Sequence, residues 1–214
     1  MATQYSSFPT HSQGKPFPST PLRASPSTGL RVNRAQDKPL RHCSGQALRG
    51  RAHRLFHEWE QLAAFVEQRS DIAMQVVDAT PEGIPTAYSI DYFIKCICGV
   101  NVDGSPVFAH EFRMEIKLPE RYPQVDAMPC FRFVGGTLPW HPNIGYHGEL
   151  AGRVCVNMPD THASLAWAVE RVALYLRYEL YHAMPEPPYP EDLKVAYWVR
   201  TQGEPNNWIY YDQD

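Results

Sequence analysis

The sequence predicts one α+β domain. In it an N-terminal helix precedes a four-stranded antiparallel meander, and a reactive loop, a long helix and a short helix follow. Three observations carry this prediction: a helical stripe of apolar residues from residue 48, short alternating segments between 72 and 133, and a second helical stripe after residue 164. Short connections favour antiparallel neighbours, and the apolar face of such a sheet needs helices to cover it.

The first helix is expected from residue 48 onward. Its apolar residues recur at intervals of three and four: Leu48, Ala52, Leu55, Trp59, Leu62 and Val66. Ser44 is the expected N-cap, because a serine hydroxyl can accept a hydrogen bond from the free N–H groups of the first turn. Arg49, Arg51 and Arg54 lie off the apolar stripe and are expected to be solvated charges.

The strands are expected where apolar residues alternate with polar or small ones. They cover residues 72–76, 88–98, 112–118 and 131–133. The second runs unbroken through Cys96 and Cys98, which we interpret as core residues. Cys130, beside the fourth strand, is interpreted in the same way.

Two helices are expected after the reactive loop. The apolar stripe of the long helix consists of Leu165, Val169, Val172, Leu176 and Leu180. Thr161 or Ser164 is the expected cap, and Pro185 bounds the end. The short helix is expected between Pro190 and Gly203.

Residues 1–44 are expected to form a disordered, basic, Ser/Pro-rich tail ahead of a domain at 45–214. The first 36 residues contain no acid, six serines and five prolines. Residues 55–214 carry eleven lysines and arginines against twenty-two acids, a net charge of −11. No apolar run approaches the length of a membrane span. The tail has no apolar h-region, and the number of cysteines is odd, which together favour a reducing compartment such as the cytoplasm.

The stretch Pro139–Asp160 contains the candidate chemistry. Cys155 is expected to be a nucleophile, and the side-chain amide of Asn143 is expected to donate to the oxyanion that forms when the thiol attacks an acyl group. Three glycines between the two residues permit the tight backbone that would bring them together. Asp160 and Asn157 could steer an incoming amine. The alternative interpretation is that Cys155 is a small core hydrophobe at a strand end.

The motif His141-Pro142-Asn143, a glycine-bearing loop and then Gly152-Arg153-Val154-Cys155 resembles the active-site signature of ubiquitin-conjugating enzymes. A second match is Phe112-x-x-x-Ile116-x-x-Pro119-x-x-Tyr122-Pro123, which is similar to the strand and Tyr-Pro turn before the active site in that family. The resemblance covers about residues 47 to 200.

This resemblance implies an acyl transferase that holds a ubiquitin-like protein as a thioester on Cys155. It implies three partners: the modifier, its ATP-dependent activating enzyme and a target protein with an acceptor amine. No bound cofactor, metal, nucleic acid or membrane is expected. His141 and Pro142 would support the site, and basic residues of the first helix, Arg54 among them, would dock the activating enzyme.

The chain also departs from the family pattern. The gap between Asn143 and Cys155 is longer than usual, and the C-terminal helical region is abbreviated, which suggests a divergent, bacterial-type conjugating enzyme. Three alternatives remain open. One is a non-catalytic modifier-binding module of the same fold, and another is a cysteine hydrolase with His147 or His162 as base. The third is a metal site built from His141, His147, Cys155 and His162.

Overall fold

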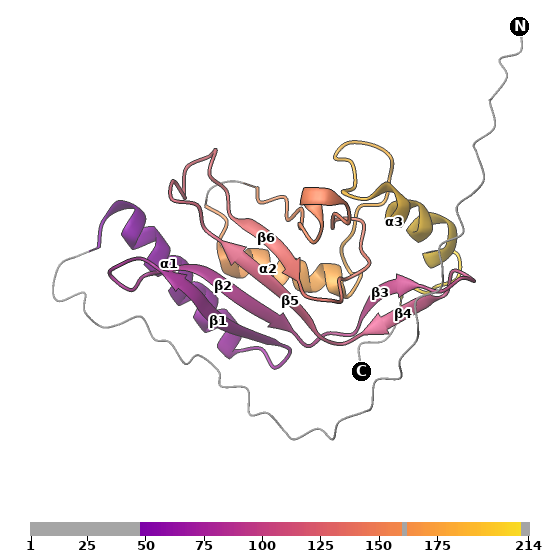
Figure 1. The fold of residues 1–214 in the computed structure, drawn as a ribbon, viewed down its shortest axis with the longest axis horizontal. Coiled ribbons are helices and arrows are strands. Elements are labelled where there is room, and N and C mark those ends of the chain that lie inside the picture. Colours follow the sequence, from indigo (N-terminus) through magenta and orange to yellow (C-terminus); the bar gives the residue numbers. More distant parts are fainter. Residues whose placement is uncertain (1–47, 160–161, 211–214) are drawn as a thin grey trace, which may run out of the picture. The chain divides into compact units, whose positions relative to one another are not determined.

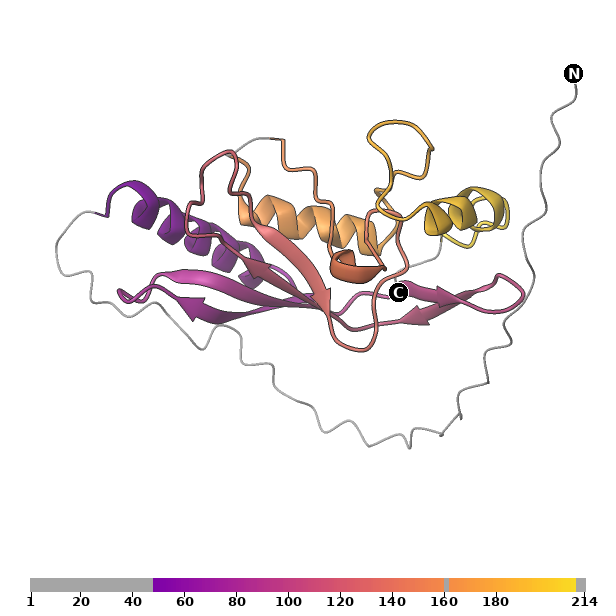
Figure 2. The same ribbon diagram turned by 45° about the horizontal axis from the view of Figure 1, so that its top comes forward.

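The computed structural model describes residues 48–159 and 162–210, which are drawn in colour in Figures 1 and 2. Its helical elements are α1 (Gly50–Glu67), η1 (Gly148–Leu150), α2 (Leu165–Leu176), α3 (Leu193–Trp198) and the π-helical turn η2 (Val199–Gly203). Its strands are β1 (Ile72–Ala79), β2 (Pro85–Tyr92), β3 (Cys96–Val100), β4 (Pro106–Ala109), β5 (Phe112–Lys117) and β6 (Cys130–Val134). The expected tail at 1–44, which includes Ser44, lies outside the described residues.

The predicted antiparallel meander is confirmed. Strands β1, β2, β5 and β6 form a four-stranded sheet in that order, and every neighbouring pair is antiparallel. Alternate residues of β5 are buried, as the period of two requires, whereas most residues of its neighbour β2 are buried on both faces. Helices α1 and α2 cover one face of this sheet, as Figure 2 shows, and supply the apolar layer that the sheet needs.

The second strand is not continuous, and this part of the prediction was wrong. Strand β2 ends at Tyr92, and the chain resumes as β3 at Cys96 in a separate two-stranded sheet with β4. At the break, the Phe93 N–H donates to the carbonyl of Asp71 at 2.8 Å. Tyr92, Ile94 and Cys96 are nevertheless all buried. The same side of the chain faces inward across the break, so the alternation continues although the hydrogen-bonding partner changes.

The burial of the three cysteines that were interpreted as core residues differs from the expectation. Cys96 is fully buried, whereas Cys98 is only partly buried and Cys130 is exposed. Cys130 opens strand β6, whose buried positions are Phe131 and Phe133. Cys130 is therefore one of the alternate residues of β6 whose side chains point away from the core.

Helix α1 begins at Gly50 with Arg49 at the N-cap position, so the expectation that Ser44 caps this helix was wrong, and Arg49 forms no side-chain cap. Its buried stripe includes Glu58, which is only 1 % exposed. One oxygen of Glu58 accepts from the Tyr122 hydroxyl at 2.6 Å and from Arg54 Nε at 2.7 Å. The other accepts from the backbone N–H of Leu165 at 2.7 Å. This carboxylate thus ties α1 to the Tyr-Pro turn and to the N-terminus of α2.

The arginine docking face expected on α1 is only partly available. Arg54 is paired with Glu58 and also donates to the carbonyl of Ala163 at 3.2 Å. Arg51 Nη2 donates to the Pro119 carbonyl at 3.4 Å. Arg49 is exposed. Two of the three guanidinium groups are therefore used within the domain.

Helix α2 is capped as expected, because Ser164 Oγ accepts from the N–H of Trp167 at 3.1 Å. The helix ends at Leu176 instead of extending to Leu180. Tyr178 adopts a left-handed backbone with φ of 56°, which is incompatible with continuing the helix. The carbonyl of Leu180 is consequently free to bond elsewhere.

The short helix α3 begins after Asp192, whose Oδ1 accepts from the N–H groups of Lys194 and Val195 at 2.9 and 3.0 Å. This confirms a short helix between Pro190 and Gly203. Across the described parts of the chain, no helix combines the length and the apolar character needed to cross a membrane.

Candidate functional site

The loop between Asn143 and Cys155 folds back on itself as a short antiparallel ribbon. The N–H of Gly145 donates to the Arg153 carbonyl at 2.9 Å, and the N–H of Gly152 donates to the Gly145 carbonyl at 2.8 Å. The Cys155 N–H then donates to the carbonyl of Asn143 at 2.9 Å. The longer gap in this chain is therefore closed by backbone pairing, and the two predicted site residues lie side by side.

Two of the loop's glycines are required by close backbone approach. Gly152 has φ of +77°, and a Cβ at this position would lie 2.2 Å from the carbonyl oxygen of Phe133 on β6. A Cβ at Gly145 would lie 2.6 Å from the carbonyl oxygen of Leu150. Any larger residue would push the loop away from β6 or open its turn.

His141 has the buried, hydrogen-bonded position that was expected of a structural residue. It is fully buried, and its Nδ1 lies 3.2 Å from the N–H of Asn143, while its Nε2 lies 3.2 Å from the Leu180 carbonyl. These partners require a neutral ring with the proton on Nε2. Burial lowers the pKa of His141 to about 3, so the ring is neutral at physiological pH and cannot serve as an exposed base.

Two tyrosines, one in the last turn of α2 and one just after that helix, complete this support, and the sequence analysis did not single them out. Tyr175 stacks on the His141 ring with centroids 4.9 Å apart, and its hydroxyl donates to the Cys155 carbonyl at 3.2 Å. Tyr178 meets the same ring edge-on at 5.0 Å and donates to the carbonyl of Trp140. Their three-residue spacing at the end of the predicted helix was the available signal.

The Cys155 thiol is partly exposed and lies between two polar groups. Its sulfur donates to Asn157 Oδ1 at 3.1 Å. Burial raises the pKa of the thiol, and the neighbouring carboxylate of Glu191 raises it further, whereas the charge of Arg153 lowers it. The net direction is upward, so the resting thiol is protonated at neutral pH.

Glu191 is a site residue that sequence reasoning missed. The Pro142 carbonyl accepts from the backbone N–H of Glu191 at 2.8 Å and from that of Asp192 at 3.3 Å. These bonds hold the segment before α3 against the His-Pro-Asn turn and place the Glu191 carboxylate at the thiol. In the sequence, Glu191 appeared only as an acid at the start of a helix.

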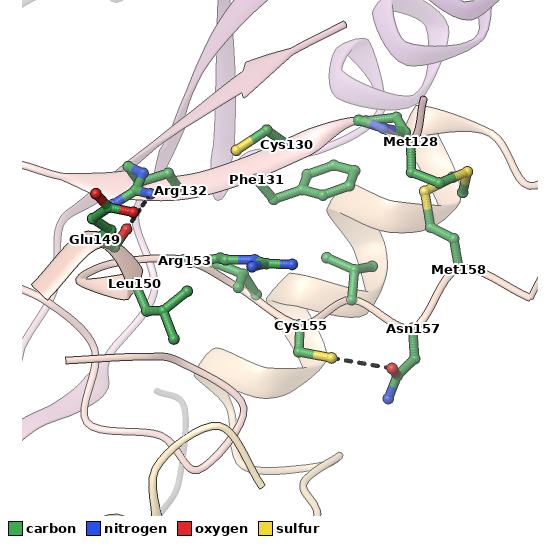
Figure 3. Close-up of a pocket in the computed structure, with 13 residues that line it drawn as sticks. Met128, Cys130, Phe131, Arg132, Glu149, Leu150, Arg153, Cys155, Asn157 and Met158 are labelled. Atoms are coloured by element: carbon green, nitrogen blue, oxygen red, sulfur yellow. Dashed lines mark hydrogen bonds between the residues drawn. The ribbon is translucent and has the colours of Figure 1, made fainter. Parts of the chain in front are cut away.

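A pocket of about 570 Å³ opens beside the thiol, between β6 and the chain on both sides of Cys155 (Figure 3). Its apolar lining includes Met128, Phe131, Leu150, Val156 and Met158. Its charged lining consists of Arg132, Glu149 and Arg153. The cysteine is therefore accessible from this pocket, and the pocket is large enough for several residues of an extended peptide.

The side chain of Asn143 is 6 % exposed and has a fixed orientation. Its Oδ1 accepts from the backbone N–H of His182 at 3.2 Å. Within residues 48–159 and 162–210, no acceptor bonds to its Nδ2 group, so both amide protons remain available as donors.

The other candidates have different positions. Asp160 lies outside the described residues. His147 is 87 % exposed, and its Nε2 lies 3.6 Å from Asp192 Oδ2. No histidine in the described part of the chain forms a hydrogen bond with the Cys155 sulfur, and no group of three or more metal-ligating side chains occurs there.

The fold and the site together define an α+β protein with an accessible thiol at the end of a backbone-paired loop. No family model matches the chain. It is 34 % identical over 98 residues to ubiquitin-conjugating enzyme E2-22 kDa of Drosophila melanogaster, a match that covers 46 % of this chain and 45 % of that protein. It is 29 % identical over 121 residues to ubiquitin-conjugating enzyme E2 N of the same organism, covering 56 % of this chain and 73 % of that protein.

Among solved structures, one similar chain is the H. polymorpha ubiquitin-conjugating enzyme Pex4p in complex with the soluble domain of Pex22p. The TM-score is 0.47 at 16 % identity, covering 75 % of this chain and 94 % of that chain. Another is a Toxoplasma gondii ubiquitin-conjugating enzyme domain, with a TM-score of 0.41 at 19 % identity. This match covers 72 % of this chain and 90 % of that chain. Over the matched segments, the sequence is thus similar to ubiquitin-conjugating enzymes, and the chain spans less than half the length of the first of these two relatives.

Proposed function

We propose that this chain is a conjugating enzyme that accepts a ubiquitin-like protein from an activating enzyme onto Cys155 and transfers it to an amine of a target protein. The observation that carries the proposal is the partly exposed Cys155 thiol beside an open pocket, paired through its backbone with Asn143. The sequence matches to ubiquitin-conjugating enzymes support it. The bacterial type of such an enzyme stays a prediction.

In the first step the thiolate of Cys155 attacks the thioester carbonyl on the activating enzyme, and the activating enzyme's thiolate leaves. In the second step an amine attacks the new thioester, and Cys155 leaves as thiolate. Both steps pass through a tetrahedral oxyanion, which requires a fixed donor. Asn143 suits this role, because His182 holds its carbonyl oxygen and leaves the amide protons free.

Glu191 suits the second step. A carboxylate at the thiol attracts the ammonium form of an incoming lysine and can accept its proton as a general base during the attack. The same charge disfavours the Cys155 thiolate, so cysteine leaves more easily once the carboxylate has accepted the proton of the amine. Asn157, which accepts from the sulfur, orients the thiol between turnovers.

A cysteine hydrolase is the second candidate function, and it needs a histidine base against the sulfur. His141 is buried and bonded at both ring nitrogens, and His147 pairs with Asp192. This arrangement favours transfer of an activated acyl group over hydrolysis of an unactivated one. A non-catalytic module would not need an open pocket at the thiol.

The test uses the full-length chain with ubiquitin, ubiquitin-activating enzyme and ATP. We expect a reductant-sensitive adduct on the wild type, a reductant-resistant ester on Cys155→Ser and no adduct on Cys155→Ala. Cys130→Ala is the matched control, because Cys130 is exposed in the same pocket, and it should load normally. An adduct that persists on Cys155→Ala would overturn the proposal. Modifier release by water at the same rate with and without added lysine would indicate a hydrolase.

A further inference from the structure

The pocket beside the thiol has a charge that the proposed transfer chemistry does not use. Arg153 stands two residues before Cys155, and in Figure 3 its side chain extends between Phe131 and Cys155. The Arg153 residue is exposed, and in the part of the chain that the structure describes no carboxylate forms an ion pair with it. Its positive charge lowers the pKa of the thiol, against the larger raising effects of burial and of Glu191.

The other charges of the pocket are engaged or lie farther along it. The guanidinium of Arg132 donates to the carbonyls of Ala151 and Glu149, the latter at 2.7 Å. The side chain of Glu149 lies at the Arg132 end of the pocket, away from Cys155 (Figure 3). With two arginines and one glutamate, the lining has a net positive charge, and Arg153 is the cation nearest the thiol among the labelled side chains.

The thiol has one carboxylate near it that is not part of the pocket and one guanidinium that is. Glu191 does not line the pocket, and its charge raises the pKa of the thiol. An amine that Glu191 attracts would therefore approach from outside the pocket, and the acyl group on the sulfur must leave that approach open. The chain that continues from the acyl group is then directed into the pocket, along the apolar wall formed by Phe131, Val156 and Met158.

From this arrangement, and on the basis of the proposed function, we infer that the pocket holds the C-terminal tail of the modifier and that Arg153 pairs with an acidic side chain of that tail. The substrate class is thus a ubiquitin-like protein with an Asp or Glu within a few residues of its C-terminal carbonyl. A basic side chain at the same place would face the Arg153 guanidinium in a partly enclosed pocket, where like charges repel.

The experiment uses short peptide thioesters, so it needs neither an activating enzyme nor an identified modifier. The peptides are acetyl-Ala₃-Gly aryl thioesters with a neutral leaving thiol, and Glu, Gln or Lys replaces each alanine in turn. Cys155 attacks the thioester carbonyl carbon, a C–S bond forms as the bond to the aryl thiol breaks, and the departing thiolate takes the proton from Cys155. Intact-mass spectrometry measures the rate of acylation.

We expect the Glu peptide to load faster than the Gln peptide at one position by about two- to fivefold, the size of one exposed ion pair, and the Lys peptide to load more slowly. The Glu/Gln ratio should fall to about one in Arg153→Gln. Taking the ratio within each variant cancels any change in the thiolate fraction. Arg113→Gln is the control, because it removes an exposed cation from the outer sheet, and it should keep the wild-type ratio.

Equal loading of all peptides on wild-type Cys155 would overturn the inference while leaving the proposed function intact. A different result would assign the pocket to the acceptor instead. In that case the Glu, Gln and Lys peptides would load onto Cys155 at equal rates, and the loaded acyl group would pass faster to lysine-containing acceptor peptides that carry acidic residues. If no peptide loads, the alkylation rates of Cys155 by iodoacetate and iodoacetamide provide the second measurement. Their ratio should fall about two- to fivefold in Arg153→Gln, and an unchanged ratio would reject the anion site.

Discussion

Gly152 gives the sharpest test of how the reactive loop is built. Replacing it with alanine has two costs. A non-glycine residue in the left-handed region, here at φ of +77°, costs about 1–2 kcal/mol. The new Cβ would also lie 2.2 Å from the Phe133 carbonyl oxygen, so the backbones must separate. The hydrogen bond from the Phe133 N–H to the Gly152 carbonyl, now 2.8 Å, would be weakened, which costs about 0.5–1.5 kcal/mol.

Together these effects predict that Gly152→Ala lowers the free energy of unfolding by about 1.5–3.5 kcal/mol. In urea, with a slope of about 2 kcal/mol per molar, the midpoint should fall by about 0.8–1.8 M. Because the loop moves away from β6, the rate of Cys155 alkylation by iodoacetamide should change as well. Urea titration followed by tryptophan fluorescence and intact-mass alkylation kinetics measure the two effects.

Two neighbouring glycines separate the contributions. Gly135 has φ of +103° but open space around its Cβ position, so Gly135→Ala measures the backbone cost alone. Gly136 has open space and no positive φ, so Gly136→Ala should be nearly neutral. If Gly152→Ala unfolds at the same urea concentration as Gly135→Ala, the close approach to β6 contributes nothing and the reasoning is refuted.

Four further outcomes are expected. Glu58→Gln should lower the free energy of unfolding by about 3 kcal/mol, because it breaks a buried ion pair, whereas Glu60→Gln on the same helix should be neutral in urea titration. The pKa of His141 is lowered to about 3 by burial, so its contribution to stability is complete above pH 6.5 and is lost as the pH falls. This loss reaches about 2 kcal/mol at pH 5, and urea midpoints of His141→Asn should show a shallower fall between pH 7 and 5. Asn143→Ala should slow single-turnover transfer to lysine by roughly 10²–10³, and transfer at the wild-type rate would remove it as the oxyanion donor. Glu191→Gln should shift the pH profile of thiol alkylation to lower pH, since the pKa falls when the negative charge is removed, and yet slow transfer to lysine; an unshifted profile would contradict its placement.

The sequence by itself determined the two long helices, the four strands of the main sheet and most of their buried positions. Apolar periodicity is a local property, because the 3.6-residue and two-residue repeats decide which side chains share a face. Helix α2 and strand β5 were predicted in this way, and Ser164 was one of the two residues expected to cap the helix from its place before an apolar stripe. The motif around Cys155 also directed attention to the stretch that lies against the pocket.

Tertiary structure decided what each element contacts. The break between Tyr92 and Cys96 was hidden, because burial continues across it while the hydrogen-bonding partner changes. Glu191 lies thirty-six positions after Cys155, and it reaches the thiol only because the Pro142 carbonyl binds its backbone. Contacts of this kind depend on groups distant in the chain, and a local pattern contains no information about their partners. For that reason the residues of the motif around Cys155 could be predicted, whereas Glu191, which acts on the thiol from a distant segment, could not.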